Sequence, residues 1–192
     1  MPVSVAGVGE SEDGGGLWVA FFRNMNLGQR RSRSPTSAEL IGAFAAAGAE
    51  PVVNVQTNGT VIFGSTEPGR TIAAVRESLR AVTGYQDVVV VRSARWVVDL
   101  SARLGAEAHG EVSLFDAAAV PDLELPWTEP TERALTVLAV DGTHAVSCWQ
   151  GELAGSNGTV LLGRLLGVPV TSRGIRTMLR LASRVESLIV EK

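Results

Sequence analysis

The sequence predicts an α+β protein built of two ferredoxin-like halves, each with the order βαββαβ and an antiparallel sheet covered by helices on one face. Two observations carry this prediction. Strand-like and helix-like segments follow that order over residues 17–91. A weaker copy follows, in which Asp-Gly-Thr at 141–143 echoes Asn-Gly-Thr at 58–60.

The first half begins with a strand at Leu17–Phe22, which is apolar and rich in aromatic residues. Thr36 and Glu39 then form a capping-box pattern, which predicts a helix to about Ala47. Residues 52–63 contain two β-rich runs around Asn58-Gly59, which predicts a hairpin with a type I′ turn.

The first half continues with helical spacing over Pro68–Val82, ended by Gly84, and with an apolar strand at Val88–Val91. A further helix is expected over Ser93–Leu104. The second half should then contain, in order, strands at Val112–Phe115, Ala134–Val140 and Thr143–Trp149, a helix at Thr159–Leu166, a strand at Val168–Thr171 and a helix over Ile175–Ile189. Its first helix is poor because three prolines interrupt it.

Length and composition limit the classes of protein. With 192 residues and 45% hydrophobic content, the chain can bury a core without disulfides, and Cys148 is its single cysteine. We expect a disordered leader over 1–16, a first half over 17–105 and a second half over 106–192. The start lacks a signal-peptide pattern and no apolar run is long enough to span a bilayer, so a cytoplasmic protein is expected.

No cofactor, metal or membrane is indicated. The sequence has no metal-ligand spacing of cysteines and histidines, no GxGxxG and no P-loop. A net charge of −3 argues against a protein that coats nucleic acid, and the aromatic strand signature of RNA-binding sheets is missing. A triad of Ser147, His144 and Asp141 can be named, but residues three apart on a strand face opposite sides.

Charge is nevertheless unevenly distributed. Four arginines and no acid lie between Arg23 and Arg33, and five arginines and no acid lie between Leu153 and Val185. Seven carboxylates and no lysine or arginine lie between Ala106 and Glu132. The two arginine-rich stretches could form an anion site, or they could be solvated partners of the acidic stretch.

Three stretches, in order, resemble the bacterial family known as domain of unknown function 1697. Members open with an apolar strand leading into Arg-Gly-Ile/Val-Asn-Val/Leu-Gly-Gly, carry a Gln-Ser-Gly-Asn-Val-Val-Phe hairpin and close with Thr-Thr-Arg-Asn-x-Arg-Thr. The corresponding stretches here are Arg23–Gln29, Gln56–Phe63 and Thr171–Thr177. The resemblance spans roughly residues 17–182 and implies the ferredoxin-like fold, in a family without an established activity.

This chain departs from the family pattern at several positions. Asn24 and Gln29 replace glycines, which restricts the φ freedom of the loop, and Gly174 replaces an asparagine. In the hairpin, either Thr57–Thr60 substitutes for the family residues or one residue is inserted.

We expect ligand-binding residues in both arginine-rich stretches. Arg23, Arg30 and Asn26 would hold a phosphate or carboxylate, and Gly28 would allow the backbone of the loop to approach it. Arg173 and Arg176, near the start of the last helix, would supply a second wall of one shared cleft. No catalytic residue is identified.

The leading functional hypothesis is therefore a protein that binds a small anionic or phosphorylated ligand. Two alternatives stay open. One is an enzyme acting on a phosphorylated metabolite, for which no general base or nucleophile stands out. The other is a structural or protein-partner module that would use the acidic stretch. The sequence does not define an oligomeric state.

Overall fold

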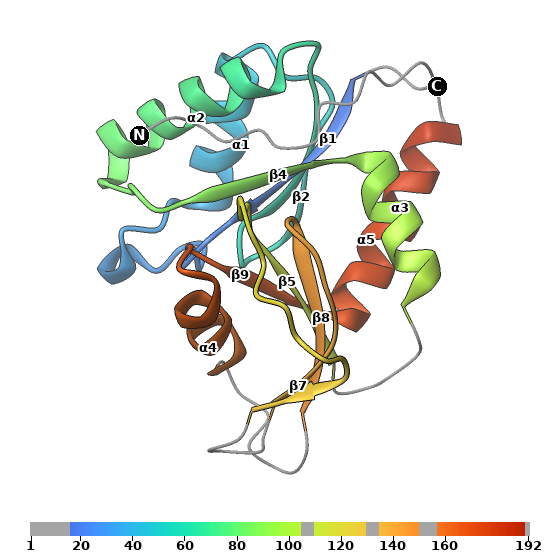
Figure 1. The fold of residues 1–192 in the computed structure, drawn as a ribbon. Coiled ribbons are helices and arrows are strands. Elements are labelled where there is room, and N and C mark those ends of the chain that lie inside the picture. Colours follow the sequence, from blue (N-terminus) through green and yellow to red (C-terminus); the bar gives the residue numbers. More distant parts are fainter. Residues whose placement is uncertain (1–15, 105–109, 130–134, 150–156, 191–192) are drawn as a thin grey trace. The chain divides into compact units, whose positions relative to one another are not determined.

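The computed structural model describes residues 16–104, 110–129, 135–149 and 157–190 (Figure 1). The chain divides into two compact units, one from Met1–Val98 with Arg184–Lys192 and the other from Asp99–Ser183. The predicted leader over 1–16 falls outside the described residues except for Gly16, and the predicted boundary near residue 106 falls outside them too.

The first unit has a four-stranded antiparallel sheet with the order β2-β3-β1-β4. Its strands are β1 (Leu17–Phe22), β2 (Val52–Gln56), β3 (Thr60–Gly64) and β4 (Val89–Ser93). Helix α1 (Ser37–Ala46) connects β1 to β2, and α2 (Pro68–Thr83) connects β3 to β4. This order and topology confirm the predicted ferredoxin-like arrangement.

Both helices of the first unit cover the same face of its sheet (Figure 1). Helix α1 begins with the predicted capping box, because the Thr36 hydroxyl accepts from the Glu39 N–H at 3.2 Å and Glu39 accepts from the Thr36 N–H at 2.7 Å. Helix α2 ends at Gly84, whose φ of 78° is left-handed. The core between the helices and the sheet includes Phe22, Leu40, Phe44, Phe63, Ile72, Val75 and Leu79.

The hairpin between β2 and β3 is confirmed, but the predicted type I′ turn is wrong. A type I′ turn needs positive φ at both central residues, and only Gly59, with φ 69°, has it. The strands are joined by three residues, Thr57 to Gly59, and the register shifts between Asn54 and Gln56. This is the longer hairpin class in which one glycine takes the left-handed position.

The second unit has a five-stranded antiparallel sheet with the order β6-β7-β8-β5-β9. Its strands are β5 (Gly110–Leu114), β6 (Trp127–Thr128), β7 (Leu135–Val140), β8 (His144–Trp149) and β9 (Thr171–Gly174). Without β6, the order β7-β8-β5-β9 repeats that of the first unit. The described residues between β5 and β7 form no helix, in keeping with the prolines there.

Helix α4 (Asn157–Leu166) covers one face of the second sheet. Its buried Leu162 packs in a core with Phe115, Leu135, Val137, Ala145 and Val170. The unit also includes the end of α3 (Ala94–Arg103) and most of α5 (Ile175–Val190). No helix in the described ranges is long and apolar enough to cross a membrane.

The strand predicted at Val168–Thr171 is displaced. The paired residues are Thr171–Gly174, which lie opposite Leu114–Glu111 of β5. Val170 is buried in the core but belongs to the connection before the strand. Arg173 is consequently a strand residue, and α5 begins two positions later at Ile175, as predicted.

We expect Gly59→Ala to destabilise the protein more than Gly48→Ala. Both glycines have positive φ, 69° and 78°, which costs an alanine about 1–2 kcal/mol. A Cβ at Gly59 would also lie 2.7 Å from Met25 Sδ and 2.8 Å from Phe22 Cβ, whereas a Cβ at Gly48 meets nothing within 4 Å. Urea denaturation of both variants measures the difference, and equal losses of unfolding free energy would contradict the close packing at Gly59.

Candidate functional site

The loop after β1 is anchored to the segment that leads into β4. The Arg23 N–H donates to the Val88 carbonyl at 3.0 Å, and the Tyr85 hydroxyl donates to the Arg23 carbonyl at 2.6 Å. The Arg23 guanidinium forms an ion pair with Asp87, at 3.0 Å to Oδ1 and 3.3 Å to Oδ2. Both the backbone and the side chain of Arg23 are therefore fixed by this segment.

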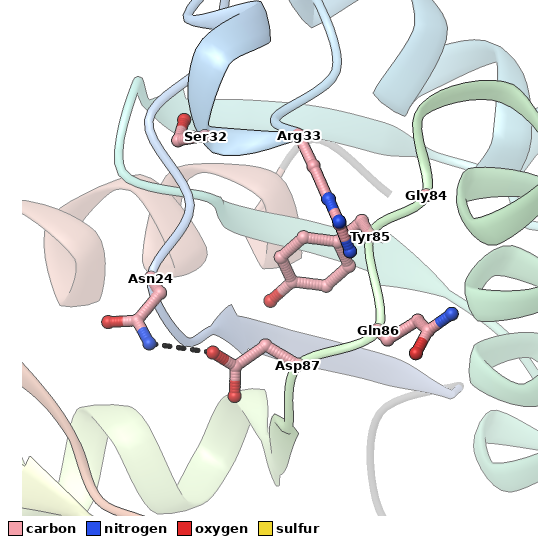
Figure 2. Close-up of a pocket in the computed structure, with 7 residues that line it drawn as sticks. All are labelled: Asn24, Ser32, Arg33, Gly84, Tyr85, Gln86 and Asp87. Carbon is pink, nitrogen blue, oxygen red and sulfur yellow. Dashed lines mark hydrogen bonds between the residues drawn. The ribbon is translucent and has the colours of Figure 1, made fainter.

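Asn24 keeps the left-handed backbone that the family glycine would allow. Its φ is 51°, in the region that asparagine tolerates better than most other residues. Asn24 thus adopts a backbone conformation that a glycine would also adopt. The Asn24 side chain adds a contact that glycine could not make, since Nδ2 donates to Asp87 Oδ2 at 2.7 Å (Figure 2).

A cavity of about 360 Å³ opens beside this loop (Figure 2). Asn24 and Asp87 form one wall, and Arg33 extends along the opposite side toward Tyr85. Arg33 has a φ of 57°. The lining residues are Asn24, Ser32, Arg33, Gly84, Tyr85, Gln86 and Asp87.

A second cavity of about 360 Å³ shares Tyr85 and Gln86 with the first. Helix α2 supplies its other lining residues, which are Ala73, Arg76, Glu77 and Arg80. Arg80 forms an ion pair with Glu77 at 2.7 Å, and this contact lowers the pKa of the Glu77 carboxyl. Arg76 is half-buried and, like Arg33, is not paired with a carboxylate of any described residue.

The other residues predicted for this loop have structural contacts of their own. The Gly28 N–H donates to the Pro35 carbonyl at 2.9 Å, and its φ of 84° accounts for the glycine. The Asn26 N–H donates to the Ser34 hydroxyl at 2.9 Å, and Asn26 is exposed. Arg30 forms an ion pair at 3.2 Å with Glu39, the glutamate of the capping box of α1.

The arginines predicted as a second wall lie in the other unit. Arg173 is buried on β9, where its Nη1 donates to Thr171 Oγ1 at 3.0 Å and to the Ser172 carbonyl at 2.8 Å. Arg176 is exposed on α5. Arg23 belongs to the first unit, so a single cleft shared by Arg23 and Arg176 stays a prediction.

A buried polar cluster in the second unit was not predicted. Ser113 and Ser172, opposite each other on β5 and β9, have their hydroxyls 2.8 Å apart, and Ser172 contacts the Thr159 hydroxyl of α4 at 2.8 Å. The Ser113 hydroxyl also donates to Glu111 Oε1 at 3.5 Å. Ser147, opposite Glu111, is fully buried and its hydroxyl has no partner among the described residues.

Glu111 is the charged member of this cluster. Burial raises the pKa of its carboxyl to about 7, and the hydrogen bond from Ser113 opposes this only in part. Helix α4 packs closely against it, because a Cβ on Gly158 would overlap the Glu111 carboxyl and lie 3.0 Å from the Trp149 ring. One sequence signal could have predicted this cluster. Glu111 and Ser113 alternate with Phe115 along the strand and so share its face, and Phe115 is a core residue.

Comparisons with known proteins agree with the sequence resemblance. Residues 17–115, about half of the chain, match the family described as "Protein of unknown function (DUF1697)". The chain therefore belongs to this family.

No curated protein matches the chain. Among solved structures, the conserved bacterial protein SP0830 from Streptococcus pneumoniae is similar, with a TM-score of 0.60 and 17% sequence identity over 89% of this chain and 98% of that one. At this identity the likeness shows a common fold and no more.

We expect Glu111 to make the folded state less stable as the pH rises from about 4.5 to 7. Its pKa is raised in the folded state, so the folded chain binds the proton more tightly than the unfolded chain. The stability that proton binding contributes is therefore lost as the pH rises through the folded pKa. Glu111→Gln imitates the protonated form. It should match the original protein at about pH 3.5, below the unfolded pKa, and exceed its unfolding free energy by about 3 kcal/mol above pH 7, because one pKa unit corresponds to about 1.4 kcal/mol.

Urea denaturation across this pH range provides the measurement. Glu124→Gln, which changes an exposed carboxylate of the same unit, serves as the matched control. If the two variants have parallel pH profiles, the buried carboxyl of Glu111 does not titrate as described.

Proposed function

We propose that the protein binds a small anionic ligand, such as a phosphorylated compound, in the cavity beside the loop after β1. The observation that carries the proposal is the charge around this cavity and its neighbour. Arg23 and Arg80 are neutralised by Asp87 and Glu77. Arg33 and Arg76 are not paired with a carboxylate of a described residue, so the two cavities carry an excess of positive charge.

Arg33 is the residue best placed to hold the anion. A guanidinium can bind a phosphate or carboxylate through two parallel hydrogen bonds, and such charge-assisted bonds are stronger than neutral ones. The opposite wall, with the Asn24 amide and the Asp87 carboxylate, suits a hydroxyl or amino group elsewhere on the ligand. A ligand of mixed character, anionic at one end and polar at the other, fits both walls.

The residues singled out in the sequence then have different tasks. Arg23 positions Asp87 through their ion pair instead of contacting the anion directly. Gly28 and Arg30 shape the loop that carries Arg33, through the contacts with Pro35 and Glu39. Asn26 is exposed and available to a larger ligand.

Arg173 and Arg176 enter the proposal separately. Arg173 is buried and already donates to two oxygens of its own strand, so Arg176 is the member of the pair that a ligand could reach. A cytoplasmic location is also part of the proposal and rests on the single free cysteine.

We expect phosphorylated compounds to raise the melting temperature of the protein and Arg33→Ala to reduce this effect. A ligand at a hundred times its Kd stabilises the folded state by about 2.7 kcal/mol. Loss of a hydrogen bond to a charged group costs about 1.5–3 kcal/mol, so the variant should bind roughly ten- to a hundredfold more weakly. Differential scanning fluorimetry with inorganic phosphate, sugar phosphates and nucleotides gives the comparison.

Arg31→Ala is the matched control, because Arg31 is an exposed neighbour that does not line the cavity. Arg176→Ala tests whether the second unit contributes to the same ligand. Equal stabilisation of the Arg33→Ala and Arg31→Ala variants by every compound would reject this cavity as the binding site.

A further inference from the structure

We propose that the second unit has a separate binding site for a small apolar carboxylate, of the kind represented by a medium-chain fatty acid. The site is a cavity of about 310 Å³ formed by the end of α3, strands β7 and β8 and the first residue of α5. All of its lining residues belong to the second unit. This inference does not depend on the function proposed for the first unit.

The lining of this cavity is mainly apolar. Leu100 and Ile175 are almost fully buried, and they form its inner surface together with Leu104 and Val146. Leu138 is 40% exposed although it is a large aliphatic residue on a strand. An apolar cavity with few polar groups is typical of small-molecule sites, which span about 300–1,000 Å³, so this one suits a small ligand.

Two polar residues complete the lining and determine the class of ligand. Arg103, in the last turn of α3, is exposed, and its Nε donates to the Asp99 carbonyl at 3.2 Å. No carboxylate in the described ranges forms an ion pair with Arg103. Its guanidinium can therefore bind a carboxylate at the edge of the apolar cavity.

The second polar residue is His144, which begins β8. Its Nδ1 lies 3.0 Å from Asp141 Oδ1, and this carboxylate also accepts the N–H groups of Thr143 at 2.7 Å and His144 at 2.9 Å. Burial alone would raise the pKa of Asp141, but the hydrogen bond from the Thr143 hydroxyl and those from the two N–H groups outweigh it and lower the pKa. The Asp141 carboxylate orients the imidazole through Nδ1, so the ring presents a fixed polar edge at the cavity.

The sequence argued against a hydrolytic triad of Asp141, His144 and Ser147, and the structure agrees with that argument. Asp141 and His144 do contact each other, because Asp141 lies in the turn. Ser147 lies on the opposite face of β8, with Glu111 and α4. The Asp141–His144 pair thus lines the cavity without a serine nucleophile.

The test is isothermal titration calorimetry of the full chain, with sodium octanoate and with octanol as the two ligands. Octanoate should bind at one site. Ala139→Phe should abolish binding, because Ala139 is an exposed lining residue whose enlargement fills the cavity. Arg103→Gln should weaken octanoate at least tenfold and leave the affinity for octanol unchanged, since octanol has no charge to pair.

Two matched variants control for general effects. Ala119→Phe adds the same ring at an exposed position outside the cavity, and Arg180→Gln removes an exposed arginine of α5 that does not line it. Both should bind octanoate like the original protein. The proposal is overturned if octanoate does not bind below its micellar concentration, if Ala139→Phe and Ala119→Phe bind it equally, or if Arg103→Gln and Arg180→Gln have the same affinity.

Discussion

The antiparallel pairing of β1 with β4 is the constraint on which the first unit and its cavity depend. Strand β1 is buried at every position and pairs on its other edge with β3, so it has no freedom to shift. Because Phe22 lies opposite Val89, the residues that leave β1 must meet the residues that enter β4. Asp87 therefore lies beside Arg23 and Asn24, 64 and 63 residues away in sequence, and the loop geometry follows from the register of the sheet.

The second unit repeats this construction, and the repeat explains the position of Arg173. Arg92 on β4 lies opposite Val19, and Arg173 on β9 lies opposite Val112. Each is buried, and each donates from Nη1 at 2.8 Å to the carbonyl of the residue before it. An arginine follows three positions later on the next helix in both units and is exposed. Arg92 and Arg173 are thus equivalent residues of the two units, and both make structural contacts. The sequence did not indicate this equivalence, because Arg173 was interpreted from its match to a family motif.

Most elements could be predicted because local patterns specify them. The capping box at Thr36 and the apolar spacing of α2 required no knowledge of distant residues. The predicted strand at Val168–Thr171 shows the limit of this approach. Its valines indicated a strand, yet the residues that pair are decided by β5, and a core position outside the sheet also buries Val170. The type I′ turn was wrong for a related reason, since the turn type depends on the register of both strands.

The candidate site was harder to predict because acidic residues distant in sequence can neutralise an arginine-rich stretch in the folded protein. The stretch from Arg23 to Arg33 has no acid, but the fold brings Asp87 to Arg23 and Glu39 to Arg30, which leaves Arg33 as the cation of the cavity. The backbone independently points to the same place. Among the described residues, Asn24 and Arg33 are the non-glycine residues with positive φ, and both line this cavity. Such conformations cost about 1–3 kcal/mol and gather at binding sites, where the surrounding contacts hold them in place.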